Sequence, residues 1–308
     1  MAGRVPHATP PALTLLLPER RRFAGQALAS DVGAALARAD RLDDGEPGER
    51  AQLLRHFQLL PRGWPMAAIT RALDADDATL HQWLRADPAH VRPDMNGARV
   101  LAIGELGLSA QEARELLAPL QPLFGDAGFP LSAPLPSRWY LALPRAAKLP
   151  GFSPPEAVLG DDLLAHLPAG PEGRRWRALL NEAQVILHHH PVNVARAAAG
   201  KLTVNSLCFW GGGSVPDQVA CAQTGVISED AELLALAKLA GLASPRPGPQ
   251  LFDLRQQRQW PSVEQRLRPG LAALGAEELL LDFADGARWL LRKGQRWRVW
   301  RRALARLA

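Results

Sequence analysis

The stretch that decides the fold class runs from residue 188 to residue 213 and reads HHHPVNVARAAAGKLTVNSLCFWGGG. It begins at the end of a helix expected over 172–189, whose apolar residues recur with a period of 3.6. It ends with an apolar strand, expected over 204–210, and a glycine turn at 211–213. A helix, a turn and a strand therefore follow one another here, and polar residues gather where they meet.

The same alternation continues along the rest of the chain. Strands are expected at 13–17, 99–103, 138–143 and 279–283, and helices at 24–42, 50–59, 65–73, 77–85, 109–124, 229–242 and 262–274. Ser109 and Glu112 form the capping-box pattern of a helix start, and Asp285-Gly286 is the dipeptide expected at a tight hairpin. Alternating strands and helices predict the α/β fold class.

Length and composition limit the class of protein. The 308 residues suffice for one large domain or two modest ones. We expect a mainly helical N-terminal segment at 1–85 that forms part of the core, an α+β portion at 86–200, and a C-terminal α/β core portion at 201–308. A hydrophobic fraction of 47% excludes a mainly disordered chain. Two cysteines cannot build a disulfide framework, and no apolar run reaches membrane-spanning length, so we expect a cytoplasmic protein without membrane contact.

The polar residues of the 188–213 stretch form the candidate ligand site. Ligands of open α/β sheets bind at the carboxyl ends of strands, and glycines let backbone N–H groups approach an anion closely. Arg196 and Lys201 would add charge-assisted contacts to a phosphate or carboxylate. The candidate ligand-binding residues are Asn193, Arg196, Lys201, Asn205, Trp210, Gly211, Gly212 and Gly213. In the structural alternative, Asn193 caps a helix and the glycines only form a tight turn.

Three further polar residues are weaker candidates: Asp87, His90 and His190. Asp87 and His90 lie in a segment that two prolines place in a loop, where an aspartate also makes local backbone hydrogen bonds. The three consecutive histidines at 188–190 would point about 100° apart on a helix and cannot converge on one ion. His190 continues the apolar stripe of the preceding helix, which favours partly buried packing. We expect no metal ion and no cofactor.

The positive charge of the chain is concentrated at its end. Residues 255–308 hold twelve basic and five acidic residues, whereas the formal net charge of the whole chain is +5. Between residues 288 and 302 tryptophans alternate with arginines, as they do in grooves that bind single-stranded nucleic acid. The alternation also describes an edge strand with Trp inside and Arg outside. We favour the edge strand and expect no nucleic-acid partner.

Several separated motifs resemble known proteins. The run His190-Pro191-Val192-Asn193-x-x-Arg196, followed by Gly200-Lys201 and Trp210-Gly211-x-Gly213, resembles archaeal-type cofactor-independent phosphoglycerate mutases where their inserted domain leads back into the alkaline-phosphatase-like core. Four motifs carry a closer resemblance: Ala86-Asp87-Pro88-x-His90, Arg138-Trp139-Tyr140-Leu141, Asn181-Glu182-x-Gln184 and Asn205-Ser206-x-x-Phe209-Trp210-Gly211-Gly212-Gly213. Together they are similar to the bacterial mutase-related regulatory proteins of the RpfE type, over roughly residues 80–245. The resemblance implies a degenerate mutase-like α/β core with an α+β portion.

The sequence departs from the catalytic mutases in the residues that bind their metal ions. The mutases carry an early Asp-Gly motif, a phosphorylated serine and later Asp and His ligands. Here Pro18-Glu19-Arg20 follows the first strand, and no histidine follows Gly213. Because two-metal phosphoryl transfer needs those ligands, the departure implies a non-catalytic, regulatory pseudoenzyme.

Two kinds of partner follow from this interpretation. We expect a small anionic ligand, such as a phosphorylated metabolite, and a regulatory protein partner. One alternative is an active cofactor-independent phosphoglycerate mutase or phosphatase. The other alternative is a nucleic-acid-binding regulator that would use the basic end.

Overall fold

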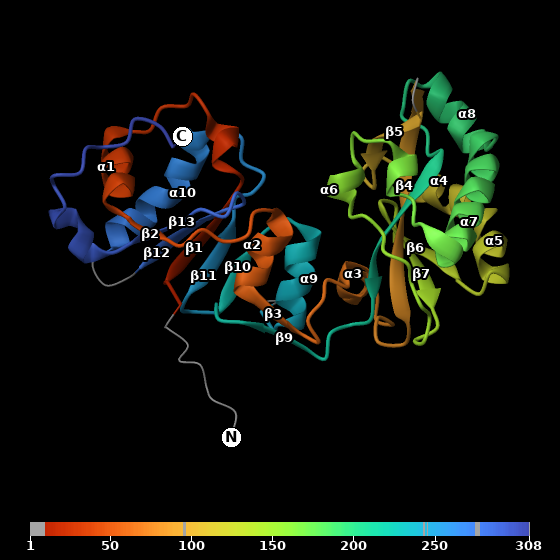
Figure 1. Ribbon diagram of the computed structural model, residues 1–308, viewed down its shortest axis with the longest axis horizontal. Coiled ribbons are helices and arrows are strands. Elements are labelled where there is room, and N and C mark those ends of the chain that lie inside the picture. Colours follow the sequence, from red (N-terminus) through yellow and green to blue (C-terminus); the bar gives the residue numbers. More distant parts are fainter. Residues whose placement is uncertain (1–9, 95–96, 243, 245, 275–277, 308) are drawn as a thin grey trace. The chain divides into compact units, whose positions relative to one another are not determined.

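The computed structural model describes residues 10–94, 97–242, 244, 246–274 and 278–307. The chain divides into two compact units, which are described separately (Figure 1). Unit 1 comprises Met1–Pro61 and Gln218–Ala308, and unit 2 comprises Arg62–Asp217. Each unit combines a β-sheet with helices, so the predicted α/β class is confirmed.

Unit 1 contains a six-stranded sheet in the order β10-β11-β1-β12-β13-β2. Its parallel strands are β10 (Gly225–Ile227), β11 (Gln250–Asp253), β1 (Leu13–Leu17) and β12 (Leu279–Phe283). The antiparallel edge consists of β13 (Arg288–Leu291) and β2 (Asp40–Leu42). Helices α1 (Ser30–Arg38), α2 (Glu49–His56), α9 (Ala231–Leu239) and α10 (Trp260–Ala273) flank it, with the short 3-10 helices η1 (Arg20–Phe23) and η3 (Lys293–Trp297). A separate ladder pairs β3 (Phe57–Leu60) with β9 (Gln218–Cys221).

The predicted strand β1 is the centre of the unit 1 sheet. Its side chains alternate between the two faces, as in any strand. Leu15 and Leu17 belong to the apolar cluster that α1 and α10 complete, while Leu16 is buried on the other face. The predicted hairpin is also confirmed, because β12 and β13 pair antiparallel across Asp285-Gly286. Gly286 adopts φ +93°, a conformation that favours glycine.

Unit 2 is built on one long strand, β4 (Gln82–Asp94). The order of its five-stranded sheet is β5-β4-β7-β6, and β8 also pairs with β4. The other strands are β5 (Gly97–Ile103), β6 (Leu131–Leu135), β7 (Arg138–Leu143) and β8 (Ser206–Gly213). The helices are α3 (Met66–Asp74), α4 (Ala110–Leu117), α5 (Leu120–Asp126), α6 (Pro155–Val158), α7 (Gly170–His188) and α8 (Pro191–Ala198), with the 3-10 helix η2 (Leu163–His166).

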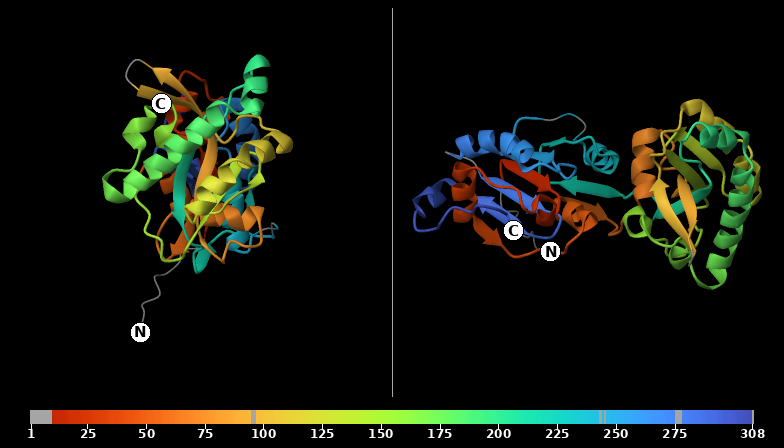
Figure 2. Two further views of the ribbon diagram at one scale, coloured as in Figure 1. Left: turned by 90° about the vertical axis from the view of Figure 1, so that its right-hand side faces the viewer. Right: turned by 90° about the horizontal axis from the view of Figure 1, so that it is seen from above.

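The predicted amphipathic helix is α7, which crosses the strands of unit 2 in the left view of Figure 2. Its apolar stripe is buried, and Trp176 stacks on Phe129 with ring centroids 4.9 Å apart. The predicted capping box also forms, because Ser109 and Glu112 exchange side chain to backbone hydrogen bonds at the start of α4. These elements were predictable because their signals lie within a few residues of each other.

Several predicted elements were wrong. The helix expected at 77–85 and the loop expected at 87–94 are replaced by β4, because pairing with three strands overrides its two prolines. The helix expected at 109–124 is split into α4 and α5 beside Pro119. The expected glycine turn at 211–213 lies inside β8.

The domain boundaries expected at 85/86 and 200/201 both lie within unit 2. Strand β4 runs through the first boundary, and β8, which lies beyond the second boundary, pairs with β4. One sheet therefore joins the three predicted portions.

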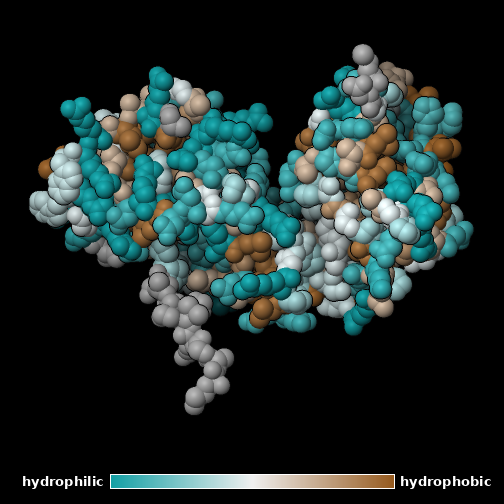
Figure 3. All heavy atoms as spheres, in the orientation of Figure 1, coloured by the Kyte–Doolittle hydropathy of each residue, from teal (hydrophilic) through white to brown (hydrophobic). Residues whose placement is uncertain are grey.

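The surface is mainly polar on the face that Figure 3 shows, where hydrophobic side chains form small separate groups. Among the described residues, no helix is long and apolar enough to cross a membrane.

Candidate functional site

Arg196, the central residue of the predicted anion site, lies on α8 and is only 2% exposed. Its Nε donates to the carbonyl of Leu202 at 2.8 Å, and Nη2 donates to the carbonyl of Leu106 at 2.6 Å. Its Nη1 forms an ion pair with Glu112 at 2.9 Å and a longer hydrogen bond to the carbonyl of Gly107. The guanidinium therefore already has internal acceptors, and it ties α8 to the start of α4.

The two predicted asparagines also have internal partners. Asn193 is buried and does not cap α8; its amide bonds the carbonyls of Leu187 and Val204 and accepts from the N–H of Val204. Asn205 bonds both the N–H and the carbonyl of Val91 in β4. Lys201, in the same segment, is exposed. Asn193, Arg196 and Asn205 lie close together as predicted and connect protein segments. The predicted glycines lie at the opposite end of β8, beside α3, so the structure does not bring the whole candidate set together. Anion binding by these residues stays a prediction.

The three glycines allow close packing inside unit 2. A Cβ atom at Gly211 would lie 3.1 Å from the backbone nitrogen of Ala67 in α3, and one at Gly213 would lie 2.6 Å from Pro65. A Cβ atom at Gly212 would approach Leu149 to 2.5 Å. Gly211 also adopts φ +67°. Protein atoms thus fill the positions that a Cβ atom would take at these glycines, although Gly212 itself is exposed to solvent.

Asp87, a weaker candidate, anchors a buried polar cluster together with Trp210. Arg85 Nε and the indole Nε1 of Trp210 donate to its carboxylate at 2.8 and 2.7 Å, and the backbone N–H of Trp139 donates at 3.3 Å. Burial raises the pKa of Asp87, and the charge of Arg85 and the hydrogen bond from Trp210 oppose that rise. Because Asp87 is 2% exposed, these contacts hold the sheet together and leave the carboxylate no open side.

The cluster continues through residues that the sequence did not single out. Arg85 Nη1 donates to Thr70 at 3.2 Å, and the hydroxyl of Tyr140 reaches Thr70 at 3.0 Å and Asp74 at 2.6 Å. Asp74 also accepts two hydrogen bonds from Arg138. Burial raises the pKa of Tyr140 well above its usual range. The sequence signal for this cluster was the arginine and aromatic residues in β4 and β7. Their side chains share one face of the sheet, so they can contact one another.

The candidate histidines have structural roles. His90 Nδ1 lies 2.9 Å from the carbonyl of Thr203, and His190 caps α8 by accepting from the N–H of Val192 at 3.2 Å. His188 and His189 are exposed, and His190 is partly buried as expected. Within the part of the chain that the structure describes, no three His, Cys, Asp or Glu side chains are arranged to hold a metal ion.

A second polar region lies in unit 1, at the carboxyl ends of the parallel strands. Asp282 of β12 is fully buried and accepts two hydrogen bonds from Arg55, at 2.6 and 3.0 Å. His56 Nε2 lies 2.8 Å from the same carboxylate. Burial alone raises the pKa of Asp282, but the hydrogen bonds from His56 and Arg55 outweigh burial and hold the pKa below its usual range.

Next to it, Arg255 lies among several carboxylates and is 3% exposed. It holds Asp253 at the end of β11 through two side-chain hydrogen bonds, and its Nη2 lies 3.1 Å from Asp230 at the start of α9. Its Nη1 lies 3.3 Å from Glu49 of α2. Burial tends to raise the pKa of Asp253, but Arg255 keeps it below its usual range. The sequence signal for this cluster was Asp253-Leu254-Arg255 directly after the apolar pair Leu251-Phe252.

Divalent metal ions do not fit this region. A metal site needs carboxylate oxygens that converge on an empty position. Here the guanidinium of Arg255 takes that position, and Arg55 occupies both oxygens of Asp282. A cavity of about 280 Å³ opens beside the cluster, but Arg21 and Arg22 in its lining are balanced by Glu19 and Glu49.

The basic end of the chain combines buried and exposed tryptophans. Trp289 in β13 is 2% exposed and lies under the guanidinium of Arg41, so it points inside as expected. The expected edge strand is wrong, because β13 pairs with both β12 and β2. Trp297 and Trp300 lie beyond the strand and are 69% and 74% exposed, so the Trp-inside pattern is wrong for them. Nothing in this arrangement tests nucleic-acid binding.

Comparison with known proteins gives a partial relationship. No family model matches the chain. A probable 2,3-bisphosphoglycerate-independent phosphoglycerate mutase of Geobacter sulfurreducens is 33% identical over 111 residues, and the Methanosarcina barkeri mutase is 31% identical over 110 residues. Each match covers 35% of this chain, and the chain spans only about a quarter of these relatives, 27% and 28% of their lengths.

Two solved structures resemble the chain over 92% of its length at lower identity. The cofactor-independent phosphoglycerate mutase of Thermoplasma acidophilum has a TM-score of 0.42 at 16% identity and is covered over 90% of its chain. A Pyrococcus horikoshii protein has a TM-score of 0.48 at 13% identity and is covered over 87%. The sequence matches thus relate about a third of this chain, at low identity, to cofactor-independent phosphoglycerate mutases.

Proposed function

We propose that this chain is a non-catalytic, regulatory relative of the cofactor-independent phosphoglycerate mutases, of the bacterial RpfE type, and that it acts in the cytoplasm with a regulatory protein partner. The observation that carries the proposal is the position of Arg255 among Asp253, Asp230 and Glu49. Two-metal phosphoryl transfer needs carboxylates that neutralise metal charge next to the transferred group. In this chain the carboxylates already neutralise an arginine.

The active-mutase alternative would require Arg255 to leave its position. Removing one partner of a buried ion pair leaves an uncompensated charge, which costs about 3–5 kcal/mol. The binding of a metal ion would have to offset that cost before any net affinity remained. The ion pairs therefore favour a stable, metal-free polar cluster over a catalytic centre.

We keep a phosphorylated metabolite as the expected ligand in this proposal, but no contact in the structure identifies where it would bind. Arg196 gives it no support, because its N–H groups already contact Leu106, Leu202 and Glu112. A nucleic-acid partner would rest only on the exposed tryptophans and arginines after β13.

Metal binding and turnover test the proposal together. We expect the purified protein to bind Mn²⁺ only weakly in calorimetry and to convert neither 3-phosphoglycerate nor p-nitrophenyl phosphate with Mn²⁺ present. Arg255→Gln removes the internal cation and frees the carboxylates, so its Mn²⁺ affinity should rise at least tenfold. Arg258→Gln removes an exposed positive charge from the same unit and should not change the affinity. Turnover that a chelator abolishes, or equal Mn²⁺ affinity in the parent and Arg255→Gln, would contradict the proposal.

A further inference from the structure

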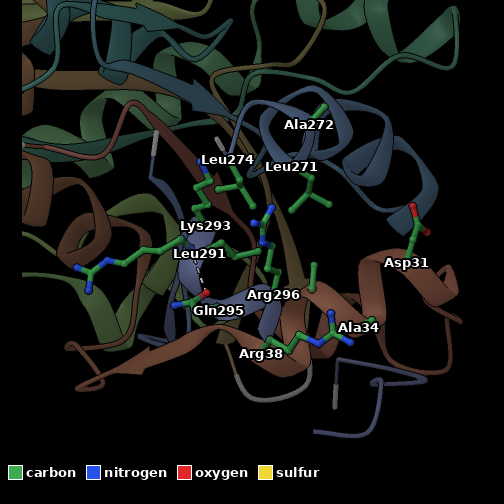
Figure 4. Close-up of a pocket in the computed structure, with 12 residues that line it drawn as sticks. Asp31, Ala34, Arg38, Leu271, Ala272, Leu274, Leu291, Lys293, Gln295 and Arg296 are labelled. Carbon is green, nitrogen blue, oxygen red and sulfur yellow. Dashed lines mark hydrogen bonds between the residues drawn. The ribbon is translucent and has the colours of Figure 1, made fainter. Parts of the chain in front are cut away.

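A cavity of about 340 Å³ lies in unit 1 between α1, α10 and the segment that follows β13 (Figure 4). Its apolar wall includes Ala34 and Ala35 of α1, Leu271 and Ala272 of α10, Leu274 just after α10, and Leu291 of β13. The alanines have short side chains, so they leave space between the two helices. The volume is at the lower end of the range of small-molecule sites, about 300–1,000 Å³.

The cavity is separate from the polar cluster around Arg255. Leu291, the last residue of β13, pairs with Leu279, the first residue of β12. The cavity therefore lies at the amino end of the parallel strands, whereas Asp253 and Asp282 lie at or near their carboxyl ends. A ligand here does not depend on the proposed function.

The polar part of the cavity is strongly basic. Its lining includes Arg38, Arg292, Lys293 and Arg296. Asp31, the one acidic lining residue in the described part of the chain, is ion-paired with Arg268. In Figure 4 the side chains of Lys293 and Arg296 extend toward Leu271 of α10 and Leu274, which directly follows α10.

Most of this positive charge is uncompensated. Arg292 is paired with Glu278 at 2.7 Å, but the other three cations make no ion pair within the described part of the chain. The Nε atom of Arg38 is enclosed and, among the described residues, has no hydrogen-bond acceptor. Because three of the four lining cations lack an acidic partner among the described residues, the cavity favours an anionic ligand.

From this geometry we propose that the cavity binds a small amphipathic anion. Its alkyl or aryl body packs against Ala35, Leu271 and Leu291, and its carboxylate or phosphate group lies between Arg38, Lys293 and Arg296. The apolar wall releases water when the body binds, and the anionic group relieves repulsion between three neighbouring cations. Both parts of the ligand are needed, because the wall has no charge and the cations are partly exposed.

Isothermal titration with octanoate and octyl phosphate at constant ionic strength tests this proposal, and the two probes distinguish the two anionic groups. We expect one equivalent of at least one probe to bind at submillimolar concentration. Octan-1-ol lacks the charge and inorganic phosphate lacks the apolar body, so each should bind at least tenfold more weakly. Equal affinity for octan-1-ol, or no binding of either anionic probe at millimolar concentration, would overturn the proposal.

Two variants separate the contributions of charge and space. Lys293→Gln with Arg296→Gln should weaken binding at least tenfold, and Ala34→Leu should also weaken it by filling the cavity while keeping the cations. The matched control, Arg258→Gln with Arg266→Gln, removes two exposed charges from unit 1 outside the cavity lining. Circular dichroism checks that all three variants fold. Unchanged affinity in both cavity variants, or an equal loss in the control, would show that the probe binds elsewhere.

Discussion

Replacing Arg196 by Met separates an internal role from a ligand-binding role. Methionine keeps much of the apolar stem but removes every guanidinium hydrogen bond. The carbonyls of Leu106 and Leu202 lose their donors, and Glu112 loses its ionic partner. Breaking a buried pair costs about 3–5 kcal/mol, and since the Glu112 side chain is 23% exposed and can be hydrated, we expect about 3 kcal/mol.

Thermal unfolding followed by circular dichroism measures this loss. For a unit of this size each kcal/mol lowers the midpoint by about 2–4 °C, so the Arg196→Met midpoint should fall by about 6–12 °C. Lys201→Met is the matched control, because Lys201 is exposed in the same segment and its loss should cost less than about 0.5 kcal/mol. Hydrogen exchange should show the loss of protection in α8 and β8. If Arg196→Met is as stable as Lys201→Met, the internal role is refuted and the guanidinium is available to a ligand.

Two further predictions concern the buried polar clusters. Because hydrogen bonds from Arg55 and His56 depress the pKa of Asp282, its contribution to stability is present above the unfolded value of about 3.9 and is lost as the pH falls through the lower folded value. Asp282→Asn should therefore destabilise unit 1 by about 3–5 kcal/mol at pH 7, and urea titrations should show the difference from the parent shrinking below about pH 4; a pH-independent difference would contradict the ion-pair argument. In unit 2, Tyr140→Phe removes the hydroxyl that contacts Thr70 and Asp74 and should cost about 1–3 kcal/mol in urea unfolding, and an unchanged midpoint would show that these hydrogen bonds add no net stability.

Local signals predicted the elements that local contacts form. The apolar stripe of α7, the Ser109–Glu112 box and the Asp285-Gly286 hairpin each depend on residues close in sequence. Strand β4 could not be predicted in this way, because β5, β7 and β8 stabilise it and two of them lie far along the chain.

The same limit applied to the candidate site. Asn193, Arg196 and Asn205 were predicted to lie together, and they do. Their roles depend on partners such as Glu112 and Leu106, which lie 84 and 90 residues before Arg196. Residue type alone cannot distinguish a cation that holds a loop from one that holds a ligand. Arg255 was missed because its partners come from α2, β11 and the start of α9.

The central position of β1 has a consequence for biosynthesis. Leu13 pairs with Gln250 and Leu279, so the strand leaves the ribosome more than 230 residues before either partner. At about 5–20 residues per second, Leu13–Leu17 waits unpaired for on the order of 10–50 s. An apolar strand exposed for that time is prone to aggregate, and a proline and charged residues beside it oppose intermolecular pairing. The run Pro18-Glu19-Arg20-Arg21-Arg22 directly follows the strand and would protect the nascent chain until the neighbouring strands are made.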